Sequence, residues 1–138
     1  MRPVVAVAGV GAVAVLAASP TAAYAVWAAG GSGAGGGASA VMPTGTPPTG
    51  TGGTGTASLR WTAATLSSGA GVSGYRITRY NAANGSPSTI GGTCAGTVTS
   101  TSCSDQSVPT GTWTYTVTPL LTTWSGGESS PSAAVTVN

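Results

Sequence analysis

The sequence predicts an all-β fold, a seven-stranded antiparallel β-sandwich, over residues 41–138 of its 138 residues. Large apolar residues and threonines alternate strictly from Thr112 to Thr118, which is the pattern of a strand with one buried face. Short segments of this kind recur at intervals of about ten residues, as in two-sheet sandwiches. No helical periodicity appears after residue 40, so we expect a domain built from strands alone.

The composition excludes most catalytic chemistry. Charged residues make up 4% of the chain, against about 25% in an average globular domain, and there is no lysine and no histidine. Acid–base catalysis and metal binding draw chiefly on His, Asp, Glu, Lys and Cys, so we expect no catalytic residue, no metal site and no cofactor. The net charge of +2 is too small for a surface that binds nucleic acid.

Residues 1–25 have the organisation of a signal peptide, which we expect to be an apolar helix. One arginine precedes an apolar run at residues 3–18, and Ala23-Tyr24-Ala25 offers the small residues that a signal peptidase requires. Cleavage there makes Val26 the first residue of a secreted or cell-surface protein. The alternative is an uncleaved segment, residues 1–29, that anchors the protein in the membrane, although the apolar run is shorter than the ~20 residues that span a bilayer.

Residues 26–40 are expected to form a flexible linker, because the run at residues 30–37 consists of Gly, Ser and Ala. A phosphate-binding glycine loop is the alternative interpretation of such a run. That motif requires a lysine, which the chain lacks. The linker therefore leads into one domain at residues 41–138.

The first two strands are expected at residues 41–46 and 57–63. Three prolines in and after the first segment exclude a helix or a central strand, so this segment is predicted to be an edge strand. In the second segment apolar and polar residues alternate, and Trp61 is the largest side chain on the inward face.

The third strand is expected at residues 74–80, with Tyr75 and Ile77 toward the core and Tyr80 on the outer face. Arg79 shares the side of the core residues. We expect its methylene groups to lie along the edge of the core and its guanidinium to reach water. The Asn-Gly pair that follows favours a hairpin turn.

Four further strands are expected at residues 88–90, 97–99, 111–118 and 131–137. The alternation of residues 111–118 is the strongest of these patterns, and its large side chains share one face. The side chains expected in the core are Trp61, Tyr75, Ile77, Trp113, Tyr115 and Val117.

Cys94 and Cys103 are the only cysteines, and in an exported protein a pair this close in sequence predicts a disulfide. A redox or metal-binding thiol pair is the alternative. The spacing is not C-x-x-C, however, and no histidine or second cysteine pair is present to complete a zinc site.

Asp105 and Glu128 are the only carboxylate side chains, and both lie in segments predicted to be turns. We interpret the first as a turn or capping residue and the second as a solvated loop charge. They are not expected to act as the carboxylate pair of a glycosidase. Serines are plentiful, but without a histidine or lysine no base activates them as nucleophiles.

Three motifs in order give the chain a family resemblance: Leu59-Arg60-Trp61, Gly74-Tyr75-Arg76-Ile77, and the turn that leads into Trp113-Thr114-Tyr115-Thr116-Val117. Residues 41–138 resemble a fibronectin type III domain, an immunoglobulin-like sandwich. The family usually has a tyrosine where this sequence has Trp113, and that hydroxyl ties the preceding corner. The resemblance leaves two roles for Trp113: it caps the corner through its indole N–H, or it is simply a core residue.

The start of the chain carries a second resemblance. The segment Ala23-Tyr24-Ala25-Val26-Trp27, followed by a Gly-Ser run, resembles exported Gram-positive proteins with a SipW-dependent-type signal. That class includes matrix and surface components, which favours secretion or surface exposure.

We therefore expect a non-catalytic secreted or cell-surface module used for adhesion, spacing or binding of a ligand such as carbohydrate. Its partner would be cell-wall or extracellular polysaccharide, or another surface protein. Trp124 in the last loop is the candidate centre of a binding surface, with Tyr80 as a second candidate. The alternative is that Trp124 folds over the end of the sandwich and covers Leu120 and Leu121.

Two other functions fit the same composition. Near-zero charge after processing and threonine-rich edge strands suit a structural subunit of an extracellular matrix or surface assembly. The family resemblance also suits an accessory module of a secreted polysaccharide-degrading system.

Overall fold

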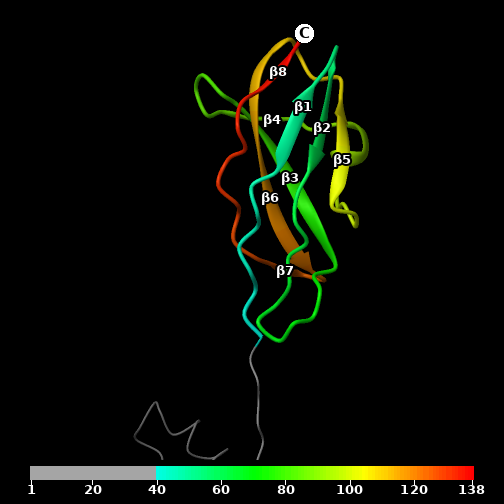
Figure 1. The fold of residues 1–138 in the computed structure, drawn as a ribbon, viewed down its shortest axis with the longest axis vertical. Helices are drawn as coiled ribbons and strands as arrows, with labels where there is room; N and C mark the ends of the chain where they lie inside the picture. Colours follow the sequence, from blue (N-terminus) through cyan, green and yellow to red (C-terminus); the bar gives the residue numbers. More distant parts are fainter. Residues whose placement is uncertain (1–39) are drawn as a thin grey trace, which may run out of the picture. The chain divides into compact units, whose positions relative to one another are not determined.

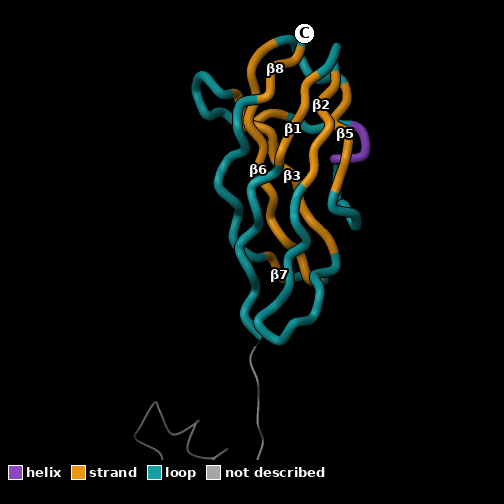
Figure 2. Tube along the Cα trace, in the orientation of Figure 1, coloured by secondary structure: helices purple, strands orange, loops and turns teal. Residues whose placement is uncertain are grey.

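The computed structural model describes residues 40–138, so the expected signal helix and nearly all of the expected linker lie outside the described residues. The described chain forms two antiparallel sheets with a hydrophobic core between them (Figure 1). Its only helical element is one turn of 3-10 helix, and the rest is strand and loop (Figure 2). An all-β sandwich, as the alternation of apolar residues predicted, is confirmed for this part of the chain.

The elements in chain order are β1 (Thr49–Gly52), β2 (Thr56–Arg60), β3 (Gly74–Asn81), β4 (Pro87–Ser88), η2 (Gly92–Cys94), β5 (Ser102–Gln106), β6 (Gly111–Leu121), β7 (Trp124–Ser125) and β8 (Val135–Val137). One sheet has the order β1-β2-β5. The other has the order β4-β3-β6-β7, with β8 also paired to β6.

The described chain has eight short strands, whereas seven were predicted, because the final strand is interrupted. β7 pairs with one end of β6, at Leu120 and Leu121, and β8 pairs with the other end, at residues 111–113. Between them the chain still follows β6, since Ser129 N–H donates to Val117 O and Ser132 N–H donates to Tyr115 O. The last strand is therefore continued by isolated backbone hydrogen bonds rather than by a full ladder.

The position of the first strand was predicted wrongly. Residues 41–46 make one isolated bridge, from Thr44 to Gly127, and the first strand that pairs with β2 begins at Thr49. Proline has no N–H to donate to a ladder, so regular pairing starts only after Pro47 and Pro48.

The strand expected at residues 97–99 was also wrong. Val98 makes a single bridge to Tyr75, and the strand of this region is β5, farther along the chain. The residues of β5, Ser-Cys-Ser-Asp-Gln, look like a loop in the sequence because only one of them is apolar. β5 nevertheless pairs with β2 over its whole length, and its inward side chains are Cys103 and Asp105.

The remaining elements differ from prediction mainly at their ends. β2 stops at Arg60, and Ala63, which was expected to face inward, is exposed. The third strand lies where the alternation placed it, and Gly85, with a φ of 69°, provides the positive φ angle of the hairpin that follows. β6 runs three residues beyond position 118, to Leu121.

The core lies between the two sheets and includes all six side chains expected there. Trp61 and Tyr75 pack edge to face, with ring centroids 5.4 Å apart. Tyr115 and Val117 from the centre of β6 are completely buried. The buried hydrophobic cluster consists of Ala57, Leu59, Trp61, Ala64, Tyr75, Ile77, Cys94, Val98, Cys103, Val108, Trp113, Tyr115, Val117, Val135 and Val137.

Candidate functional site

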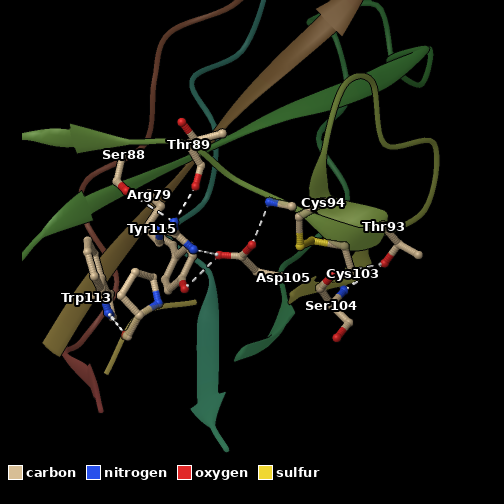
Figure 3. Close-up of polar contacts among 12 residues, drawn as sticks. Arg79, Ser88, Thr89, Thr93, Cys94, Cys103, Ser104, Asp105, Trp113 and Tyr115 are labelled. Carbon is tan, nitrogen blue, oxygen red and sulfur yellow. Dashed lines mark hydrogen bonds and ion pairs between the residues drawn. A yellow bond between two sulfur atoms is a disulfide. The ribbon is translucent and has the colours of Figure 1, made fainter. Parts of the chain in front are cut away.

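A buried ion pair joins the two sheets (Figure 3). Arg79 of β3 donates from Nη1 to Asp105 Oδ2 of β5 at 2.7 Å, and the two side chains are 4% and 0% exposed. The expectation that the Arg79 guanidinium reaches water was wrong, and so was the assignment of Asp105 to a turn. Each charge is buried because the facing strand supplies the opposite charge, which no local pattern in the sequence reveals.

The carboxylate of Asp105 receives two further hydrogen bonds, which fix it in place. Gly91 N–H donates to Oδ1 at 2.7 Å, and the Tyr115 hydroxyl donates to Oδ2 at 3.1 Å. Burial, and then the negative charge of Asp105, raise the pKa of Tyr115. This carboxylate has no solvent access, so the cluster is part of the fold rather than a catalytic site.

Around Arg79 the polar contacts extend to the chain after β4. Nη2 donates to Ser88 Oγ at 3.1 Å and to the carbonyl oxygen of Thr89. Cys94 and Cys103 form a disulfide that ties η2 to β5 beside this cluster (Figure 3). The disulfide therefore ties down the segment after β4, in which Thr89 and Gly91 form hydrogen bonds with the ion pair.

Trp113 combines the two roles that the sequence left open. Its indole Nε1–H donates to Pro109 O at 2.9 Å, which ties the corner before β6. Its ring is 7% exposed and lies against Arg79, whose Cζ is 4.8 Å from the ring centroid.

Trp124 is the main candidate for a ligand contact, and its side chain is 70% exposed. It lies at the start of β7 opposite Leu121, at the end of the sandwich where the described chain begins. Beside it is a hollow of about 240 Å³ lined by Ala40, Met42, Leu66, Leu121 and Thr122. An open indole next to an apolar hollow is suited to contact with a sugar ring or a protein surface.

Tyr80, the second candidate, lies on the outer face of β3 and is half-buried. Its hydroxyl donates to Glu128 Oε1 at 2.7 Å, and the Thr116 hydroxyl donates to the same oxygen at 2.5 Å. These hydrogen bonds, that of Thr116 first and that of Tyr80 second, hold the pKa of Glu128 below its usual value. No pattern in the sequence predicts this pairing, because the two residues are 48 positions apart and no repeat or spacing links them.

The two candidate residues do not form one surface. Tyr80 pairs with Thr114 and Trp124 pairs with Leu121, which places them seven residues apart along β6 (positions 114 and 121), roughly 23 Å at about 3.3 Å per residue. An odd separation also directs the side chains to opposite faces of the sheet. The structure therefore presents two separate candidate surfaces.

Among residues 40–138 no group of three His, Cys, Asp or Glu side chains is placed to hold a metal ion. Over the same residues, no helix has the length and apolar character needed to cross a membrane.

Comparisons with known proteins bear on the fold. No protein-family model and no curated protein matches the sequence. Among solved structures the chain is similar to domains A168–A170 of titin, with 15% identity and a TM-score of 0.55 over 72% of this chain and 34% of that one. The match thus spans about a third of the titin fragment. It is also similar to a Fn3-like protein from Clostridium thermocellum, with 28% identity and a TM-score of 0.46 over 73% of this chain and 94% of that one.

The likeness to titin concerns the fold alone. Together with the strand orders β1-β2-β5 and β4-β3-β6-β7, it supports a fibronectin type III-like β-sandwich. Such a sandwich is a scaffold that hosts many functions, so the function has to be argued from the surface.

Proposed function

We propose that this protein is a non-catalytic module, displayed outside the cell, that binds an extracellular or cell-wall polysaccharide through the end of the sandwich around Trp124. The observation that carries the proposal is the 70% exposure of this indole. The other tryptophans of the described domain, Trp61 and Trp113, are 8% and 7% exposed. Together with Leu66 and Leu121, which line the hollow beside it, this indole forms an apolar surface suited to a sugar ring.

The chemistry of the described residues favours binding over catalysis. Asp105 is enclosed by its ion pair, and Glu128 is held by hydroxyl groups rather than by a second carboxylate. Hydrolysis of a glycosidic bond uses two carboxyl groups that flank the bond, and these two have different surroundings and no shared opening. An accessory module of a secreted polysaccharide-degrading system fits the proposal too, because such a module binds the polysaccharide without cleaving it.

The location outside the cell rests on the sequence of residues 1–25 and on the disulfide. Disulfides persist in oxidising compartments, and the Cys94–Cys103 bond encloses a short segment of a small domain. Cell fractionation with N-terminal sequencing tests this part. A chain starting at Val26 in the medium or wall fraction would support it, whereas a reduced protein in the cytoplasm would contradict it.

Binding is tested by co-sedimentation of the purified protein with insoluble cell-wall polysaccharide. Trp124→Ala should abolish the bound fraction and leave the unfolding midpoint unchanged, because an exposed side chain contributes little to stability. Thr123→Ala, an exposed change in the same loop, is the matched control and should bind as the wild type does. Equal binding by the Trp124 variant would remove the proposal.

A second function is favoured by one observation. All four residues of β1 are exposed, and among residues 40–138 this strand forms a ladder only with β2, although Gly50 and Gly52 approach Val135 and Thr136 of β8. A structural subunit of a surface assembly would use such an edge strand. Sedimentation velocity over a range of concentrations separates a monomeric binding module from a self-associating subunit.

A further inference from the structure

We propose that a second site, separate from the Trp124 end, binds a saccharide that carries a free amino group. The site is the hollow on the outer face of β3 and β6, which we call the Glu128 hollow. It has a volume of about 320 Å³, within the usual range of small-ligand sites. It is lined by Tyr80, Gly85, Thr114, Thr116, Glu128, Ser129 and Pro131.

Hydrogen bonds hold one oxygen of the Glu128 carboxylate, and its other oxygen is available to a ligand. Both hydroxyl donors, from Tyr80 and Thr116, bind the same oxygen, Oε1. Oε2 has no hydrogen-bond partner within residues 40–138, and the side chain is exposed. Hydrogen bonds to an ionised carboxylate favour its charged form, which agrees with the lowered pKa of this group. The hollow therefore presents an oriented anionic acceptor to solvent.

No cation of the described chain neutralises this charge at close range. The ion pair between Arg79 and Asp105 is the one that residues 40–138 form, and it is internal. Arg76 on the same face exerts only the weakest of the influences on Glu128. The sequence has no lysine, so no side chain of another copy supplies an ammonium group. A cationic amine on a side chain at this hollow would therefore come from a different molecule.

The rest of the lining favours a sugar ring over a simple amine. The ring of Tyr80 borders the hollow and offers a π face to a cation and to the C–H groups of a pyranose. Thr114 adds a hydroxyl group that both donates and accepts hydrogen bonds, as sugar hydroxyls require. An amino sugar can contact the Glu128 carboxylate, the Tyr80 ring and the Thr114 hydroxyl at once. The end of a lysine side chain can contact the carboxylate and the ring, but it has no hydroxyl groups to pair with Thr114.

The test is calorimetric titration of the intact protein at pH 6 with oligomers of glucosamine and, separately, with oligomers of N-acetylglucosamine, which have no free amine. The glucosamine oligomers should bind and the acetylated ones should bind at least tenfold more weakly. Glu128→Gln keeps the size and an acceptor oxygen but removes the charge. We expect it to weaken binding of the free-amine oligomers by about tenfold, because hydrogen bonds to charged groups are the strong ones.

Two arginine variants separate the effect of a charge near the hollow from the effect of the protein's net charge. Arg76→Ser should strengthen binding about twofold, since Arg76 repels a cationic ligand from the same face. Arg60→Ser removes the same charge from β2 in the other sheet and should leave the affinity unchanged. Near-UV circular dichroism of each variant checks that the fold is intact.

The groups that face Glu128 are Tyr80 and Arg76 of β3 and Thr116 of β6. Since the pKa of Glu128 lies below its ordinary 4.5, affinity should persist at pH 5 and be lost only as the carboxylate protonates at pH values below 4.5. Trp124→Ala should leave this binding unchanged, so the two proposed sites fail or succeed independently. Equal binding of both oligomers, no effect of Glu128→Gln, or binding of a lysine-rich peptide in place of the glucosamine oligomers would overturn the proposal.

Discussion

Arg79 and Asp105 form an ion pair across the two sheets, with Nη1 2.7 Å from Oδ2 and both side chains buried. Arg79 belongs to β3 of one sheet and Asp105 to β5 of the other, so this contact crosses the core. Tyr115 and Gly91 donate hydrogen bonds to Asp105, while Arg79 lies against the ring of Trp113 and donates to Ser88 and Thr89. The contribution of this ion pair to the free energy of unfolding can therefore be tested by removing one charge or both.

Asp105→Ala should lower the free energy of unfolding by about 3–5 kcal/mol, because it leaves the Arg79 charge buried without its partner. Urea denaturation followed by tryptophan fluorescence measures the loss. The double variant Arg79→Met/Asp105→Leu should lose less than the single variant, since it leaves no buried charge. A single variant as stable as Arg60→Ser, which removes an exposed charge, would contradict this role.

Two serines continue the pairing of β6 where the last strand is interrupted. Ser129 Oγ accepts from Val117 N–H at 3.0 Å, and Ser132 Oγ accepts from Tyr115 N–H at 3.0 Å. Replacing either serine by alanine leaves a buried amide without a partner and should cost about 1–3 kcal/mol. Ser130→Ala, between them and exposed, should change the stability by no more than about 0.5 kcal/mol. Equal effects of all three changes in chemical denaturation would show that the side-chain hydroxyls do not pair β6.

Trp113→Phe should lower the free energy of unfolding by about 0.5–1.5 kcal/mol through loss of the hydrogen bond to Pro109 O. Phenylalanine keeps an aromatic ring beside Arg79, but it is smaller than the buried indole, so a packing loss adds to the loss of the bond at the corner. Trp124→Phe is the matched control in an exposed position and should leave the unfolding midpoint where it is. A fully stable Trp113→Phe would mean that the corner is held by packing alone.

Stability should fall in alkaline solution because Tyr115 and Tyr80 have raised pKa values in the folded state. Burial is the main cause for Tyr115, and the hydrogen bond to Glu128 is the main cause for Tyr80. Above about pH 10 the unfolded chain releases tyrosine protons that the folded chain retains. The unfolded state then binds fewer protons, so the free energy of unfolding decreases as pH rises.

Urea denaturation between pH 8 and about pH 11 measures this dependence. Tyr115→Phe removes the group with the larger shift and should flatten the profile, although it is less stable at pH 8 because its bond to Asp105 is lost. A wild-type profile that is flat through this range, or a variant profile as steep as that of the wild type, would contradict the assignment.

The parts of the fold that followed from the sequence are those in which neighbouring residues alternate. Tyr75 and Ile77 in β3 and Trp113, Tyr115 and Val117 in β6 are buried because a strand sends successive side chains to opposite faces. β5 escaped prediction because its inward residues are Cys103 and Asp105, whose burial depends on a disulfide and an ion pair with distant partners. The gap in the last strand was missed for a similar reason, since the serines that bridge it pair with β6 through their hydroxyls.

By itself, the sequence determined a strand-rich segment, a single cysteine pair and a small number of ionisable side chains, because composition and local alternation carry that information. Only the tertiary structure decided where the charges lie. It buried Arg79 against Asp105 and brought Tyr80 to Glu128, while it left Trp124 open at the end of the sandwich. These outcomes depend on which segments become neighbours, and side-chain contacts across 26 or 48 positions leave no periodic trace in the sequence.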